Sequence, residues 1–146
     1  MNTKKPKKTK NVSVHYAEHE TGWVEPLGDG TFRVCNIPMM MSNLNIDDIV
    51  TLKPGNPACC SRSVIDQVLR EVYAHRVAVE YPGDPPTVAK AAYKALWHAV
   101  DGIEGKCEGW TPGWAGVAVH DVEKLENALS QLPFETSIQT GVEGEA

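Results

Sequence analysis

The sequence lacks long apolar runs and the familiar motifs of catalytic sites. No stretch approaches the about 18 apolar residues of a membrane-spanning helix, and no apolar segment follows the basic start of the chain. We therefore expect a cytoplasmic protein that does not contact membranes. P-loop, dinucleotide-binding, zinc-protease helix and serine-hydrolase elbow motifs are also missing. These absences favour a protein without catalytic machinery, and an enzyme of unnamed chemistry stays an alternative.

Cysteine is scarce, and its spacing does not suit metal binding. The four cysteines are Cys35, Cys59, Cys60 and Cys107. They form no Cys-x-x-Cys pair, and two adjacent cysteines cannot easily bind one zinc ion in tetrahedral geometry. His15, Glu18 and His19 have the spacing of an inverted zinc-protease motif, but they lie in a predicted loop rather than on one helix face. We expect no metal and no cofactor, and a role for Cys59-Cys60 stays open.

The charge that is present is distributed unevenly. The net charge of −5 combines a basic start with an acidic remainder. The first ten residues contain no acid and five lysines: Lys4, Lys5, Lys7, Lys8 and Lys10. Residues 11–74 carry a formal charge of −4 and residues 75–146 one of −6. An acidic body repels nucleic acid and suits a basic protein partner, so only the lysine tail could contact phosphate.

The first half of the chain shows the pattern of short strands joined by turns. Apolar residues alternate over 12–16, and Gly28-Asp29-Gly30 offers the positive φ angles that a tight hairpin needs. Further strands are expected at 31–37 and 47–52, whereas the periodicity of 64–73 fits a helix or a strand equally well. The sequence predicts a small β-barrel or curved antiparallel sheet over residues 12–74.

The second half alternates strands with two amphipathic helices. Asp84 and Asp121 are the predicted N-caps, and Gly102 is placed to end the first helix. The resulting order, β-α-β-β-α-β, is that of a ferredoxin-like module. The expected fold is therefore α+β, with a disordered basic tail at 1–11, a barrel-like module at 12–74, a ferredoxin-like module at 75–140 and an acidic tail at 141–146.

One segment carries a family resemblance. Residues 23–38 read W-V-E-P-L-G-D-G-T-F-R-V-C-N-I-P, which resembles the W-x-E-P-L-G-D-G-x-[FY]-x-[LV]-x-N-I-P signature of an uncharacterised bacterial domain family. An acidic strand follows at 47–50. The resemblance implies a two-part fold of unknown function and favours a strand at 64–73, and it implies no activity. In the motif, Trp23 and Phe32 are expected to anchor the core.

The most suggestive binding feature is a hairpin with two tryptophans. Trp110 and Trp114 flank the turn Pro112-Gly113, and tryptophan is enriched at binding hot spots. Glu104 and Glu108 would give this patch an anionic rim. The pattern predicts a protein-binding or ligand-stacking hairpin, and the alternative is that both rings fold back over the helical layer.

These observations lead to one principal functional hypothesis and two alternatives. The acidic modules and the tryptophan hairpin predict a binding protein that neutralises or regulates a basic protein partner, as an immunity protein or inhibitor does. The first alternative is a small-molecule-sensing module that dimerises through its ferredoxin-like half. The second is a nucleic-acid or ribosome accessory that uses the lysine-rich tail.

Overall fold

Alternating apolar residues build a closed barrel from the first half of the chain. In this computed structural model, which describes residues 10–17, 20–39, 43–55 and 62–139, the barrel strands are β1 (Val12–Ala17), β2 (Glu20–Pro26), β3 (Phe32–Val34), β4 (Ile49–Lys53) and β5 (Val64–Arg70). Consecutive strands pair antiparallel, and β5 closes the barrel by pairing parallel to β1. The barrel is therefore mixed, which confirms the small barrel and resolves residues 64–70 as a strand.

The barrel core confirms one expectation from the motif and corrects another. Gly28 and Gly30 have φ angles of 92° and 86°, as the predicted hairpin turn requires. Trp23, expected in the core, is 49% exposed. Successive strand residues point to opposite sides, and Val24 is fully buried, so Trp23 must face out. Phe32 does pack, partly buried, against the barrel core.

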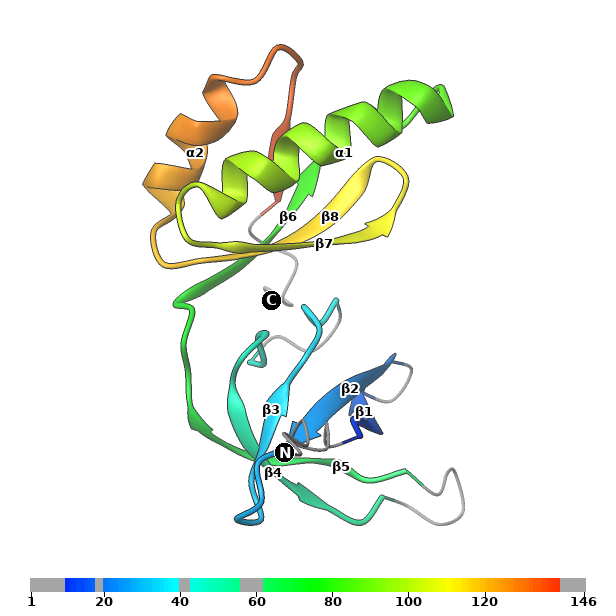
Figure 1. The fold of residues 1–146 in the computed structure, drawn as a ribbon, viewed down its shortest axis with the longest axis vertical. Coiled ribbons are helices and arrows are strands. Elements are labelled where there is room, and N and C mark those ends of the chain that lie inside the picture. The colour runs from blue at the N-terminus through cyan, green and yellow to red at the C-terminus, as the bar shows by residue number, and fades with distance from the viewer. Residues whose placement is uncertain (1–9, 18–19, 40–42, 56–61, 140–146) are drawn as a thin grey trace, which may run out of the picture.

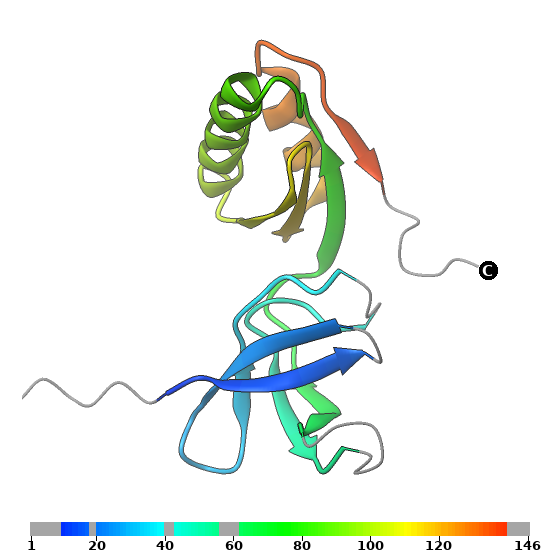
Figure 2. The same ribbon diagram turned by 90° about the vertical axis from the view of Figure 1, so that its right-hand side faces the viewer.

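The second half forms a ferredoxin-like layer. Its elements are β6 (His75–Glu80), α1 (Pro86–Asp101), β7 (Lys106–Thr111), β8 (Trp114–Val119), α2 (Val122–Ser130) and β9 (Ser137–Gln139). The sheet order is β7-β8-β6-β9, and all of its pairs are antiparallel. Figure 1 shows this layer stacked on the barrel along the long axis of the molecule, and Figure 2 shows the helices on one side of the sheet. The predicted α+β fold is confirmed.

The two helices begin in different ways. The Asp121 carboxylate accepts hydrogen bonds from the backbone N–H groups of Glu123 and Lys124, at 2.9 and 3.3 Å, and caps α2 as predicted. The predicted cap at Asp84 is wrong, because Pro85 holds the N-cap position of α1 without a side-chain cap bond. Pro86 then fits the first turn, where its missing N–H is not needed.

The two faces of the second sheet pack against different parts of the molecule. Valines of β6 and β8 point toward the helices and pack with Leu96, Val100, Leu125 and Leu129 in the larger core. Three central residues of the opposite parity, Ala78, Gly116 and Ala118, are small and buried. That face is thus shaped to receive a segment of the barrel.

Three further expectations concern the boundary between the modules, the two tails and membrane-spanning helices. The predicted boundary at residue 74 falls between β5 and β6. The predicted acidic tail at 141–146 and all but the last two residues of the predicted basic tail at 1–11 lie outside the described residues. No helix in the described part of the chain is long and apolar enough to cross a lipid bilayer.

Candidate functional site

The loop that leaves β3 packs against the barrel-facing side of the second sheet. Their contact is a small apolar cluster formed by Ile37, Ile46, Tyr73, Trp110 and Ala118. Two hydrogen bonds flank the cluster. Asn45 Nδ2 donates to the carbonyl of His75 at 3.1 Å, and Arg76 Nη1 donates to the carbonyl of Leu44 at 3.0 Å. These contacts join the two halves directly.

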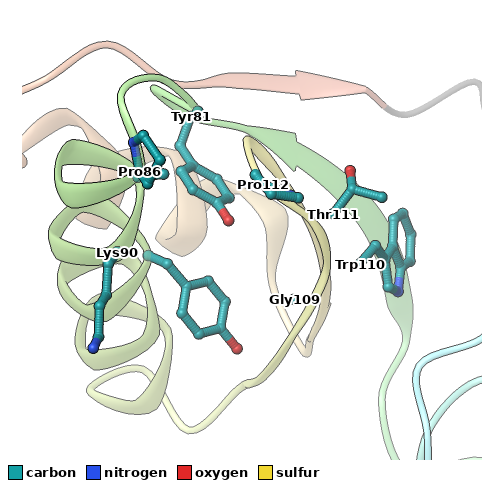
Figure 3. Close-up of a pocket in the computed structure, with 10 residues that line it drawn as sticks. Tyr81, Pro86, Lys90, Gly109, Trp110, Thr111 and Pro112 are labelled. Atoms are coloured by element: carbon teal, nitrogen blue, oxygen red, sulfur yellow. The ribbon is translucent and has the colours of Figure 1, made fainter.

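Trp110 is a central part of this contact. Its Nε1 donates to the Ile37 carbonyl at 3.3 Å, and its ring lies over Gly116. A Cβ at position 116 would lie 2.3 Å from a Trp110 ring carbon, so only glycine admits the ring there. Figure 3 shows the Trp110 ring directed away from Tyr81 and α1. The ring therefore covers the face opposite the helical layer.

Glu108 belongs to the same contact. Its carboxylate accepts hydrogen bonds from Asn36 Nδ2 at 3.1 Å and from the backbone N–H of Ile37 at 2.5 Å. Asn36 Oδ1 in turn accepts from the Trp23 backbone N–H at 2.7 Å. A carboxylate of β7 thus holds the start of a barrel loop, rather than forming a free anionic rim.

The other predicted site residues lie apart from this contact. Trp114 is half-buried on β8, opposite Glu80 of β6. Glu104 is exposed in the turn after α1, where its φ is 61°. The structure therefore brings Trp110 and Glu108 together at the interface between the halves, and leaves Trp114 and Glu104 outside it.

Two groups of predicted residues fall mostly or wholly outside the described part of the chain. Of the five lysines of the basic tail, Lys10 is described and exposed. Lys4, Lys5, Lys7 and Lys8 lie outside the described residues, as do Cys59 and Cys60.

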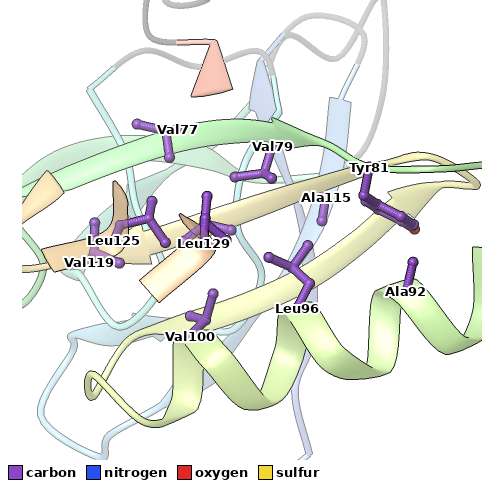
Figure 4. Packing of buried hydrophobic residues seen from close by; sticks show 11 residues of the cluster. Val77, Val79, Tyr81, Ala92, Leu96, Val100, Ala115, Val119, Leu125 and Leu129 are labelled. Carbon is purple, nitrogen blue, oxygen red and sulfur yellow. The ribbon is translucent and has the colours of Figure 1, made fainter. Parts of the chain in front are cut away.

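A cavity of about 530 Å³ opens between α1 and β7. Its lining consists of Tyr81, Gly83, Pro86, Ala89, Lys90, Tyr93, Gly109, Trp110, Thr111 and Pro112. Figure 3 shows the Tyr81 side chain between α1 and the β7–β8 hairpin, with Lys90 on the helix. Tyr81 is 7% exposed and lies at one end of the larger core, beside Ala115 and Ala92 (Figure 4). We call this space the α1–β7 cavity.

Tyr93 in the α1–β7 cavity, and Cys107 beside it, are uncharged at neutral pH. Burial raises the pKa of the Tyr93 hydroxyl, and the neighbouring Cys107 adds to the increase. Burial likewise raises the pKa of the Cys107 thiol to about 12, which a hydrogen bond with Tyr93 only partly offsets. The centroids of the Tyr81 and Tyr93 rings lie 6.1 Å apart, so the floor is a pair of aromatic rings.

A second depression lies on the other side of the layer, between α2 and β9. Two adjoining hollows of about 630 and 360 Å³ share Leu129, Ser130 and Thr136. Their remaining lining residues are Glu80, Tyr81, Pro82, Glu126, Leu132, Phe134, Glu135, Ser137 and Ile138. We call this depression the α2–β9 groove. It shares Tyr81 with the α1–β7 cavity.

The α2–β9 groove combines half-buried apolar residues with exposed acids, which we call its acidic rim. Leu132, Phe134 and Ile138 are half-buried, and Glu80, Glu126 and Glu135 are exposed. Among the described residues that line the groove there is no lysine or arginine. None of the three carboxylates forms an ion pair with another described residue. The rim is therefore available to cationic groups.

Sequence reasoning did not find the α2–β9 groove. The acids at its rim come from β6, α2 and the segment before β9, which are separated by many residues. Two signals were available, the repeated acids between residues 121 and 135 and the apolar pair Leu132 and Phe134 around Pro133. Only the fold brings Glu80 beside them.

Comparison with known proteins supports the two-part fold. The chain matches no protein-family model and no curated protein sequence. It is similar to a crystal structure described as that of a hypothetical protein from Neisseria gonorrhoeae, with a TM-score of 0.56 and 17% identity. The match covers 93% of this chain and 94% of that chain. At this identity the likeness shows a shared fold, which extends over both halves and is found in an uncharacterised bacterial protein.

Proposed function

We propose that this is a non-catalytic binding protein that takes a basic segment of a protein partner in the α2–β9 groove. The observation that carries the proposal is the acidic rim of the groove, formed by the exposed Glu80, Glu126 and Glu135 among half-buried apolar residues. Protein interfaces combine apolar anchors with a polar rim. An unpaired anionic rim selects a partner with lysine or arginine beside apolar residues.

The charge of the whole chain favours the same partner. Residues 11–146 carry a formal charge of −10, which would attract a basic partner from a distance and speed its association. The acidic charge most favours a protein that neutralises or regulates such a partner, as an immunity protein or inhibitor does. The motif over residues 23–38 would place the protein in an uncharacterised bacterial domain family.

Capture of the partner with matched variants tests this function. The full chain is used as bait in extracts of the cells that produce it, at moderate salt. One variant carries Glu80→Gln, Glu126→Gln and Glu135→Gln. The control carries Asp101→Asn, Glu104→Gln and Glu123→Gln, three exposed acids that do not line the groove.

Both variants lose three negative charges, so they separate a site from general electrostatic attraction. We expect a stable basic partner that is lost with the groove variant and retained by the control. Absence of any stable protein partner, or equal loss with both variants, would contradict the proposal.

Small-molecule sensing is the second candidate. The α1–β7 cavity favours it, since its volume lies within the roughly 300–1,000 Å³ of typical ligand sites. A nucleic-acid role for the lysine tail stays a weaker proposal. Deletion of residues 2–10 should abolish a steeply salt-dependent interaction if the tail binds phosphate.

A further inference from the structure

We propose that the α1–β7 cavity binds an aromatic carboxylate, with its ring on the two tyrosines and its carboxylate at Lys90. The cavity shares only Tyr81 with the α2–β9 groove. Its ligand is anionic, whereas the proposed partner of the groove is basic, so each proposal can be tested without the other.

The shape and lining of the cavity favour a flat apolar body. Pro86 and Ala89 of α1 form one wall, and Gly109 and Pro112 of the hairpin form the other. The tyrosine rings between these walls offer faces on which an aromatic ring stacks or makes edge contacts. A two-ring ligand fits within about 530 Å³ and leaves room for one polar substituent.

The charge of the lining selects an anionic substituent. Among the described residues that line the cavity, Lys90 is the one that carries a charge. It has no ion-pair partner among the described residues. A carboxylate can accept a charge-assisted hydrogen bond from its ammonium group.

The surroundings of Lys90 do not oppose an anion. Tyr93 and Cys107 stay protonated at neutral pH because burial raises the pKa of each. Glu108, on the neighbouring strand, is engaged by Asn36 and Ile37 on the other face of the sheet. An aromatic carboxylate thus meets these uncharged groups and a single cation.

The test compares two probes of nearly the same shape, the anionic naphthoate and the neutral naphthamide. Binding to the full chain is measured by NMR titration at neutral pH. We expect naphthoate to bind about two- to fivefold more tightly than naphthamide, because an ion pair with an exposed lysine is screened by solvent. Lys90→Ala should remove that difference. Lys94→Ala, an exposed lysine one turn further along α1 that does not line the cavity, should keep it.

Two further variants make the result decisive. Gly109→Leu places a side chain over the Tyr93 ring, whose nearest carbon would lie 3.3 Å from the new Cβ, and should abolish naphthoate binding. Glu126→Gln, in the α2–β9 groove, should leave it unchanged. Equal affinity for both probes, equal effects of the two lysine variants, no effect of Gly109→Leu, or no binding of naphthoate at millimolar concentration would each overturn the proposal.

Discussion

The carboxylate of Glu108 accepts the backbone N–H of Ile37 at 2.5 Å, which ties the edge strand of the second sheet to a loop of the barrel. Ile37 is 2% exposed, so water cannot easily replace this bond. The contact gives a residue expected on a binding surface a structural role between the two halves.

Removal of this carboxylate should weaken the whole molecule. Glu108→Ala leaves the buried Ile37 N–H without its acceptor, which costs about 1–3 kcal/mol of unfolding free energy. Urea unfolding measures the loss. Glu104→Gln, an exposed acid in the same half, should change stability by less than about 0.5 kcal/mol. Equal stability of Glu108→Ala and the unmodified chain would show that the contact does not hold the halves together.

The close approach of Trp110 to Gly116 gives a second prediction. Gly116→Ala forces the new methyl group against the Trp110 ring and Ile37, and overpacking of this kind costs about 1–3 kcal/mol. Gly102→Ala serves as the control. Its new Cβ would meet only helix carbonyl oxygens at 3.4 and 3.6 Å, and its backbone is helical with a φ of −65°. Thermal unfolding should show a clear drop for Gly116→Ala alone, and a similar drop in both variants would contradict the packing.

Asp48 gives a prediction of pH dependence. It is 1% exposed and one of its oxygens has no hydrogen-bond partner among the described residues, so burial raises its pKa to about 6. Its other oxygen accepts the Asn45 backbone N–H at 2.8 Å, which offsets the effect only partly. Because the folded chain then binds more protons than the unfolded chain between about pH 4 and 6, the unfolding free energy should fall as pH rises through that range.

The rise in the pKa of Asp48 limits the pH-dependent change in unfolding free energy to about 3 kcal/mol or less. Asp48→Asn keeps an acceptor for Asn45 and removes the ionisation, so its stability should be flatter between pH 4 and 7. Urea unfolding at several pH values checks this, with the exposed Asp101→Asn as control. If Asp48→Asn retains the full slope of the unmodified chain, the buried carboxyl is not its source.

The N-cap of α2 offers a simpler measurement. Asp121 accepts two backbone N–H groups, and Asp121→Ala should cost about 1 kcal/mol of unfolding free energy. Asp121→Asn should recover most of it, because an amide oxygen also caps a helix. No difference between the alanine and asparagine variants would argue against a capping role.

Local patterns in the sequence predicted the elements of the fold better than their contacts. The β-α-β-β-α-β order follows from periodicity and turn residues that lie close together in the chain. The parallel pairing of His15 with Val64 joins distant segments and leaves no local pattern, so the mixed barrel could not be anticipated. The exposed position of Trp23 could in principle have been predicted from the alternation of residues along its strand. Gly22 leaves space for the Tyr16 ring, and Val24 points inward, which turns Trp23 outward.

The contacts of the candidate site could not be predicted from the sequence, because they join residues that are distant in the chain. The residue types of Trp110 and Glu108 marked them as candidates, but their partners Asn36 and Ile37 lie more than 70 positions away in the chain. The α2–β9 groove needs Glu80 beside Glu135, and that proximity arises only when β9 pairs with β6.

The central claim is that the α2–β9 groove selects basic, apolar segments, and an NMR titration tests it most directly. The probes are a short capped peptide of alternating arginine and leucine and its counterpart with glutamate in place of arginine. We predict that the basic peptide shifts the amides of Leu129, Leu132 and Phe134 saturably, that salt weakens the effect, and that the acidic peptide does not bind. The variant with Glu80→Gln, Glu126→Gln and Glu135→Gln should lose this binding while the matched control retains it. Shifts centred elsewhere, or equal binding by the two variants, would contradict the claim.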